Sequence, residues 1–187
     1  MTVGILAVQG AFAEHKQKCV QLGADCIELR NHSDMHAHYD ALILPGGEST
    51  VQGKLLNDLG MFDTLKARIE SGIPVFATCA GMILLADKIE NDDKTYLRSM
   101  PITVRRNAYG RQLGSFYTES DFKGLGTVPM TFIRAPYIGS VSDEVEVLAV
   151  VDNHIVAARY KNQLAVSFHP ELNDDLRIHK MFLEFGK

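Results

Sequence analysis

The stretch FATCAGM, residues 76–82, joins a short apolar run to a cysteine that is followed by small residues. The apolar run 74–77 predicts a buried strand, and the apolar spacing after Gly81 predicts a helix. Cys79 would then lie on a sharp strand-to-helix turn, where a nucleophile is exposed at the carboxyl edge of a sheet. The positive end of the helix favours the thiolate. The alternative is a small buried core cysteine, a common role for this residue type.

Two further segments place polar groups after strand-like runs. In SFHPE, His169 and Glu171 are two positions apart and project to the same side of an extended segment. His169 can therefore face Cys79 as a base, while Glu171 orients the other ring nitrogen. In LILPGGEST, the Gly46-Gly47 turn offers backbone N–H groups to an anionic oxygen. Each segment alone could be a core histidine or an ordinary turn, but the three together predict a nucleophilic site.

The order of PGGEST, TCAG and FHPE along the chain resembles that of the class I (triad) glutamine amidotransferases. Within that family, the segments GILAVQGAFAEH, RRNAYGRQ and FIRAPYI are similar to those of the glutaminase subunits of pyridoxal 5′-phosphate synthase. The resemblance extends from residue 3 to about residue 182. It departs at Ala77, because the wider family has glycine two residues before the nucleophile.

The expected reaction is hydrolysis of the side-chain amide of L-glutamine. Cys79 is the expected nucleophile, His169 the proton carrier and Glu171 the residue that orients His169. The amide of Ala80 and an amide of the 46–47 turn are the natural donors to the oxyanion. No cofactor and no metal ion are expected.

The resemblance also implies which residues contact glutamine. An arginine suits the α-carboxylate, because its planar fork can bind both oxygens. The alternatives are a solvated strand end for Arg106 and a helix cap, together with Ser49, for Glu48. The substrate-binding residues implied are Gly46, Gly47, Glu48, Ser49, Ala80, Arg106, Ile133 and Arg134.

A partner follows from the same resemblance. It implies a barrel-type pyridoxal 5′-phosphate synthase subunit that receives the ammonia, in a large complex with many copies of each subunit, and a glutaminase that is weak until this partner docks. The chain has 187 residues, too few for a glutaminase plus a (β/α)₈ barrel of about 250 residues. We place the coupling at Gln9, Gly10 and the Gly46-Gly47 peptide. The alternatives are the glutaminase of another synthase, such as imidazole glycerol phosphate synthase, and a non-catalytic binding protein on the same fold.

Composition narrows the class of protein. With 46% hydrophobic and 22% charged residues, the chain is expected to form one domain, 1–187. A net charge of −4 argues against nucleic acid and anionic membranes as partners, and no apolar run approaches the roughly 20 residues of a membrane span.

Three cysteines fit a reducing cytoplasm, with Cys19 and Cys26 as packing residues. The histidines of NHSDMHAHYD are read as a surface loop, with a metal tract as the alternative.

The alternation of apolar runs predicts an α/β fold. We expect an open, mostly parallel sheet with helices on both faces, and added antiparallel strands in the second half. Ser49 is the expected N-cap of its helix. The expected helices are 13–22, 50–59, 61–70, 80–88 and 176–185; the expected strands are 3–8, 26–29, 41–44, 74–77, 102–105, 116–118, 130–134, 145–150, 154–160 and 164–168. Gln9, Gly46, Cys79 and His169 all follow strand ends, where ligands of such sheets bind.

Overall fold

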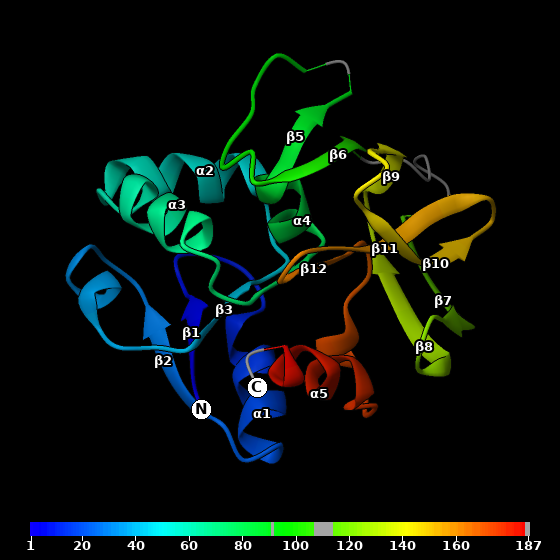
Figure 1. The fold of residues 1–187 in the computed structure, drawn as a ribbon, viewed down its shortest axis with the longest axis horizontal. Helices are drawn as coiled ribbons and strands as arrows, with labels where there is room; N and C mark the ends of the chain where they lie inside the picture. Colours follow the sequence, from blue (N-terminus) through cyan, green and yellow to red (C-terminus); the bar gives the residue numbers. More distant parts are fainter. Residues whose placement is uncertain (91, 107–113, 186–187) are drawn as a thin grey trace.

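The computed structural model describes residues 1–90, 92–106 and 114–185. Strands and helices alternate in the first half of the chain, and strands dominate the second half (Figure 1). The first half contains β1 (Thr2–Leu6), α1 (Phe12–Gln21), β2 (Asp25–Leu29), the 3₁₀ turn η1 (Ser33–His36), β3 (Ala41–Leu44), α2 (Ser49–Asp58), α3 (Phe62–Glu70), β4 (Val75–Thr78) and α4 (Ala80–Leu85). The second half contains β5 (Ala86–Ile89), β6 (Met100–Arg105), β7 (Ser115–Phe122), β8 (Gly126–Ile133), β9 (Tyr137–Val141), β10 (Glu146–Val151), β11 (His154–Tyr160), β12 (Gln163–Val166), the 3₁₀ turn η2 (Pro170–Leu172) and α5 (Arg177–Glu184).

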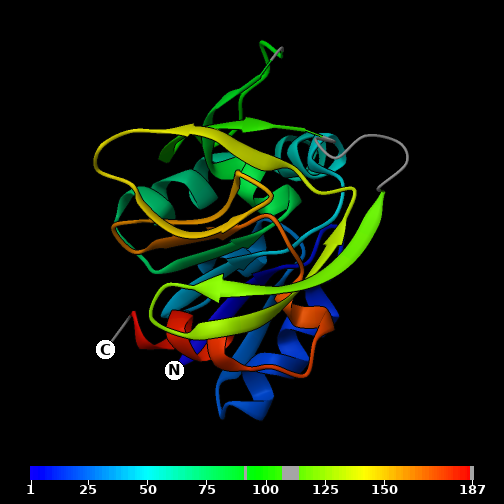
Figure 2. The same cartoon turned by 90° about the vertical axis from the view of Figure 1, so that its right-hand side faces the viewer.

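Within the described residues the main sheet has ten strands, in the order β2-β1-β3-β4-β12-β11-β9-β6-β5, with β10 paired to β11. The five strands from β2 to β12 are parallel to one another, whereas β11 pairs antiparallel with β12, β9 and β10. The predicted fold class, a mostly parallel α/β sheet with added antiparallel strands, is therefore confirmed. β7 and β8 form a separate antiparallel hairpin that contacts β10 and η2, and Figure 2 shows it as a long ribbon.

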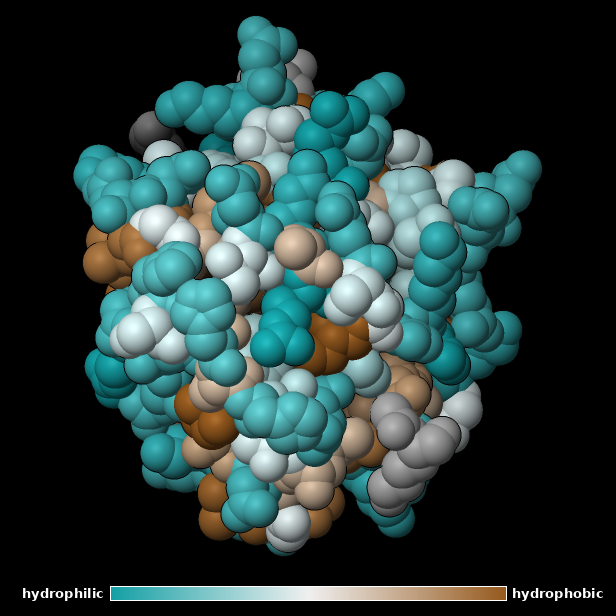
Figure 3. Space-filling view, turned by 60° about the vertical axis from the view of Figure 1, so that its left-hand side comes forward, coloured by the Kyte–Doolittle hydropathy of each residue, from teal (hydrophilic) through white to brown (hydrophobic). Residues whose placement is uncertain are grey.

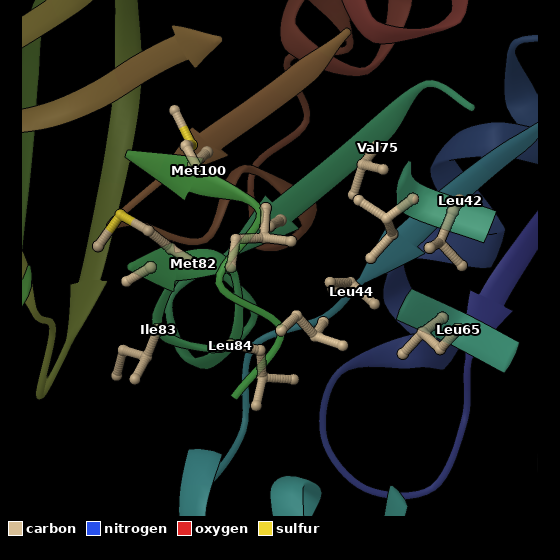
Figure 4. Close-up of a cluster of buried hydrophobic side chains, with 14 of the residues drawn as sticks. Leu42, Leu44, Leu65, Val75, Met82, Ile83, Leu84 and Met100 are labelled. Carbon is tan, nitrogen blue, oxygen red and sulfur yellow. The ribbon is translucent and has the colours of Figure 1, made fainter. Parts of the chain in front are cut away.

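Alternate residues of the central strands pack into two cores, one on each face of the sheet. In β3, Leu42 and Leu44 belong to the core that includes side chains of α2, α3 and α4 (Figure 4). Ala41 and Ile43 belong to the other core, which includes side chains of α1, α5 and the β7–β8 hairpin. Successive side chains of a strand point to opposite faces, so a continuous apolar run such as ALIL is what a doubly covered strand requires. The prediction that helices cover both faces of the sheet is confirmed.

The elbow after β4 depends on a close approach between backbones. Gly81 lies in the first turn of α4, and a Cβ there would lie 2.0 Å from the carbonyl oxygen of Leu44. Only glycine allows α4 to pack this closely on β3.

Three local predictions away from residues 167–171 were wrong. The helix expected over 80–88 ends at Leu85, because the next four residues leave the helix and pair as β5 with β6. Strand β9 was missed; its sequence YIGSV contains a glycine and a serine, which weaken a strand signal, and pairing with β6 and β11 stabilises it. The N-cap of α2 is Glu48 rather than Ser49, since the Glu48 carboxylate accepts from the backbone of Thr50 and Val51.

Candidate active site

A pocket of about 470 Å³ opens where β1, β3, β4 and β12 end. These four neighbouring strands are parallel, so the segments that follow them meet at one edge of the sheet. Glu171 is buried behind His169 and does not line the pocket. The lining residues include twelve candidates from the sequence, Gln9, Gly10, Gly46, Gly47, Glu48, Ser49, Cys79, Ala80, Arg106, Ile133, Arg134 and His169, and four that were not anticipated, Ala11, Ile83, Pro136 and Leu172.

Cys79 lies between β4 and α4 with φ 47° and ψ −103°, a backbone conformation that L-residues rarely adopt. Its N–H donates to the carbonyl of Val166 in β12 (2.8 Å), which holds the turn. The side chain of Ala77, the position that departs from the wider family, is fully buried in the core beside α2 and α4. The elbow therefore forms with alanine at this position.

His169 connects Cys79 to a buried carboxylate. Its Nδ1 lies 2.7 Å from Oε1 of Glu171, and its ring and Cβ of Cys79 both adjoin Gly46. Burial alone would lower the pKa of His169, but Cys79 and Glu171 beside the ring raise it to about 10. An imidazolium at this position stabilises a neighbouring thiolate, which is the form of cysteine that attacks a carbonyl carbon.

The backbone around Glu171 differs from the extended segment that we predicted. β12 ends at Val166, and Glu171 lies in η2, which begins directly after His169. The 3₁₀ turn still brings the carboxylate to the His169 ring, and the N–H of His169 donates to the carbonyl of Thr131 in β8 (2.8 Å). Burial opposes ionisation of Glu171, but the hydrogen bond from His169 and the charge of its ring hold the pKa of Glu171 below its usual value.

The glycine turn after β3 is held on two sides. The N–H of Gly46 donates to Oγ1 of Thr78 (2.8 Å), and the carbonyl of Gly46 accepts from the N–H of Ala11 (3.0 Å). A Cβ at Gly10 would lie 1.9 Å from that carbonyl, and φ at Gly10 is +105°, so both the space and the backbone require glycine there. The hydrogen bond between Ala11 and Gly46 therefore joins the segment after β1 to the segment after β3, next to Cys79.

Gly46→Ala is expected to lower kcat/KM for glutamine by roughly 10²-fold, because the new methyl group would lie 2.3 Å from Cε1 of His169 and displace the ring. Steady-state release of glutamate measures the effect. Gly139→Ala is the matched control, since the atom nearest to its Cβ is the carbonyl oxygen of Thr103 at 3.8 Å. Equal kcat/KM values for the two variants would show that the Gly46 contact does not constrain His169.

Two side chains hold the loop above the pocket. The N–H of Glu48 donates to Oε1 of Gln9 (2.8 Å), which connects the predicted gating residue to the glycine turn. Gln52 was missed by sequence reasoning: its Nε2 donates to the carbonyls of Gln9 (3.0 Å) and Pro45 (3.1 Å). Gln52 is fully buried at a helix position that shares a face with Leu56, so a polar residue on an apolar stripe was the available signal.

Arg106 is held in place by two other side chains. Nη1 lies 2.9 Å from Oδ2 of Asp92, and Nη2 lies 3.1 Å from the hydroxyl of Tyr96. Its Nε is buried and makes no hydrogen bond within the part of the chain that the structure describes. Arg106 is therefore a fixed cation at the pocket wall rather than a solvated strand end, in contrast to Arg105, which is exposed beside Glu90.

The remaining predicted contacts follow the β7–β8 hairpin. Ile133 ends β8, and Arg134 has φ 43°; its N–H donates to the carbonyl of Gly114. Residues 107–113, which include most of the segment RRNAYGRQ, lie outside the described residues, as do residues 91, 186 and 187.

The wider family is decided by comparison with known proteins. The model of the SNO glutamine amidotransferase family matches residues 5–186. The chain belongs to this family. A relative named pyridoxal 5′-phosphate synthase subunit PdxT, from Desulfitobacterium hafniense, is 61% identical over 184 residues, which are 98% of this chain and 92% of the relative. A PdxT of Haemophilus influenzae is 56% identical over 190 residues, which are 100% and 99% of the two chains.

Solved structures agree with this membership. A crystal structure described as a glutamine amidotransferase superposes with a TM-score of 0.92 at 42% identity, over 98% of both chains. PurLQS from Thermotoga maritima, with 14% identity and a TM-score of 0.68 over 100% of this chain and 98% of that one, shows the fold alone. The resemblance to the class I glutamine amidotransferases is confirmed. The roles of the individual site residues stay predictions.

Other sequence predictions concern residues away from the pocket. Cys19 is fully buried in the core beside α1, and Cys26 is half-buried. The segment 31–40 contains η1, and Met35 and Tyr39 anchor it in the core. No helix within the described residues is both long and apolar enough to cross a membrane.

Proposed function

We propose that Cys79, His169 and Glu171 carry out the glutamine hydrolysis of this family, and that the chain is the glutaminase subunit of a pyridoxal 5′-phosphate synthase. One observation carries the assignment of residues: His169 lies between Cys79, in the pocket, and Glu171, behind it. The relatives at 56% and 61% identity, both named as subunits of that synthase, support the assignment to a pathway.

The reaction proceeds through a covalent intermediate. The Cys79 sulfur attacks the amide carbon of glutamine, and a tetrahedral oxyanion forms. His169, protonated by the thiol, returns the proton to the leaving nitrogen, and ammonia departs. Water then attacks the γ-glutamyl thioester, with His169 as the base, and glutamate leaves. Glu171 keeps the Nδ1 proton of His169 in place throughout.

Donors and cations around the pocket suit the rest of the substrate. The N–H of Ala80, next to the nucleophile, and an N–H of the Gly46-Gly47 peptide would bind the oxyanion. The held guanidinium of Arg106, and Arg134, which also lines the pocket, suit the α-carboxylate. The Glu48 carboxylate already accepts two backbone hydrogen bonds at the N-terminus of α2. In this proposal the main role of Glu48 is therefore to cap the N-terminus of α2, rather than to bind the α-amine of glutamine.

The proposed partner is a barrel-type synthase subunit in a large hetero-oligomer in the cytoplasm. Ammonia released into water would be protonated, so its use requires a docked acceptor. On the face shown in Figure 3, hydrophobic residues lie in small groups among hydrophilic ones. Exposed apolar side chains near the pocket include Ile133 and Leu172, both at its wall.

The isolated chain is expected to be a weak glutaminase that the synthase subunit activates. A Gly-Gly peptide can rotate at low steric cost, so docking can reorient the oxyanion donor. Gly47→Val should impair the partner-activated rate, because its side chain would meet Oε1 of Gln9 at 2.4 Å and disturb the contact that holds the turn.

Glutamate release with and without the synthase subunit, at saturating glutamine, tests this proposal. Equal turnover by the free chain and the complex would remove the gating but leave the triad intact. Activation by the synthase of imidazole glycerol phosphate instead would reassign the partner. Failure of a glutamine-like electrophile to label Cys79 in the complex would indicate a binding protein without catalysis.

A further inference from the structure

A buried polar network lies on the side of Glu171 away from the pocket. His15 in α1, Thr78 at the end of β4 and His179 in α5 are all fully buried. Nε2 of His15 lies 3.1 Å from Oγ1 of Thr78 and 3.5 Å from Oε2 of Glu171, and its Nδ1 lies 3.0 Å from Nε2 of His179. The reaction described above uses neither histidine.

These groups meet because the side chain of Thr78 in β4 points to the face of the sheet that α1 and α5 cover. Thr78 is two residues after Phe76, so both side chains point to the face covered by α1 and α5. The rings of His15 and His179 both pack edge-on against Phe76, with centroid distances of 5.7 and 5.3 Å. In α1, the buried positions are His15, Lys18 and Cys19. A histidine therefore occupies the inward stripe where an apolar residue would be usual.

Hydrogen-bond chemistry determines how His15 is oriented in this network. Burial lowers the pKa of His15 below its usual value, so the ring is neutral and only one nitrogen carries a proton. A proton on Nε2 points toward Thr78 and the Glu171 carboxylate, and Nδ1 then accepts from Nε2–H of His179. The opposite tautomer would direct a lone pair at the carboxylate and would leave Nδ1–H of His179, which has no partner among the described residues, as a buried donor.

We propose that His15 is a positioning residue for glutamine hydrolysis, whose Nε2–H hydrogen-bonds to Thr78 and faces Oε2 of Glu171, an oxygen with no hydrogen bond among the described residues. This inference rests on the proposed function. Oε1 of Glu171 orients His169, and the N–H dipole of His15, 3.5 Å from Oε2, stabilises the charge on the other oxygen of the same carboxylate. Thr78 accepts from the N–H of Gly46, so the same imidazole also supports the glycine turn. His15 thus links the base to the turn proposed to bind the oxyanion.

The expected kinetic signature separates this role from glutamine binding. His15 does not line the pocket, so its loss leaves the contacts of the α-carboxylate and the α-amine in place. It acts on the position of His169 and of the turn, which matter when charge develops at the reacting carbon. The variants should therefore lower kcat and leave KM nearly unchanged.

The matched pair His15→Gln and His15→Asn tests the proposal in the complex with the synthase subunit. The glutamine amide reaches the position of Nε2, whereas the asparagine amide reaches only that of Nδ1. We expect His15→Asn to lower kcat by roughly tenfold or more, since it removes the Nε2 group that hydrogen-bonds to Thr78 and faces Oε2 of Glu171, and His15→Gln to recover most of it. KM for glutamine should stay within about twofold in both.

A third variant measures the cost of disturbing the same core without touching the network. Phe182 packs on Phe76 at a centroid distance of 5.5 Å and is fully buried, so Phe182→Leu should lower the unfolding midpoint but keep kcat. Equal kcat for His15→Gln and His15→Asn would overturn the proposal, and so would a comparable loss in Phe182→Leu. Cys79→Ala is assayed beside them: activity in that variant refutes the proposed function itself, independently of His15.

Discussion

Cys79→Ala is expected to lower glutamine turnover by roughly 10⁴-fold or more, because no other group can form the thioester. The fold should survive. The substitution removes one sulfur atom from a position at the pocket wall and retains a Cβ, so the backbone of the elbow keeps its hydrogen bond to Val166. Glutamate release in the presence of the synthase subunit, together with thermal unfolding, measures both effects.

The other two cysteines provide the controls. Cys26→Ala should retain activity and stability, since Cys26 is half-buried on β2. Cys19→Ala should retain activity but unfold more easily, because Cys19 is fully buried in the core. Turnover near that of the wild type in Cys79→Ala, or a comparable loss in Cys26→Ala, would contradict the assignment of the nucleophile.

His169→Asn is expected to be nearly as damaging as loss of Cys79, whereas Glu171→Gln should lose roughly ten- to a hundredfold less activity. Asparagine cannot carry a proton from the thiol to the leaving nitrogen. Glutamine at position 171 weakens the orientation of His169 but leaves the base present. The double variant should be far from additive, because the residues act as a unit. If Glu171→Gln proved the more harmful change, the proposed roles would be reversed.

The same pair predicts how stability depends on pH. The pKa of His169 is raised from 6.5 to about 10, so its protonated form stabilises the fold fully below pH 6.5, and this contribution is lost as the pH rises toward 10. The pKa of Glu171 is lowered from 4.5, so its contribution is present above pH 4.5 and lost as the pH falls. The difference in unfolding free energy between wild type and Glu171→Gln should therefore be largest between pH 4.5 and 6.5. Denaturant titrations across the pH range check this window.

The sequence predicted best what depends on local patterns. Strand β3 and residues 75–77 of β4 are continuous apolar runs, the pattern of strands covered on both faces, and candidate residues follow both strands. Since parallel strands end at the same edge, the meeting of Gly46, Cys79 and His169 followed from the fold class alone. Motif order then predicted the family.

What the sequence did not predict depends on tertiary pairing. Nothing local distinguishes the end of α4 from the start of β5, because pairing with β6 decides it. The extended geometry expected for SFHPE was wrong, as η2 forms there. The contact of His15 with Glu171 spans 156 positions of the chain and joins α1 to η2. Only the polar residue on the inward stripe of α1 hinted at it.

At position 79, with its positive φ, catalysis and stability favour different amino acids. A non-glycine residue in such a conformation costs of order 1–3 kcal/mol, and glycine would adopt it without that cost. The strands on either side impose the geometry, so the thiol is presented by a backbone that favours a different amino acid. In a library randomised at position 79, selection for thermal stability alone would enrich glycine and yield a more stable protein without glutaminase activity. Selection for glutamine turnover would restore cysteine despite its cost in stability.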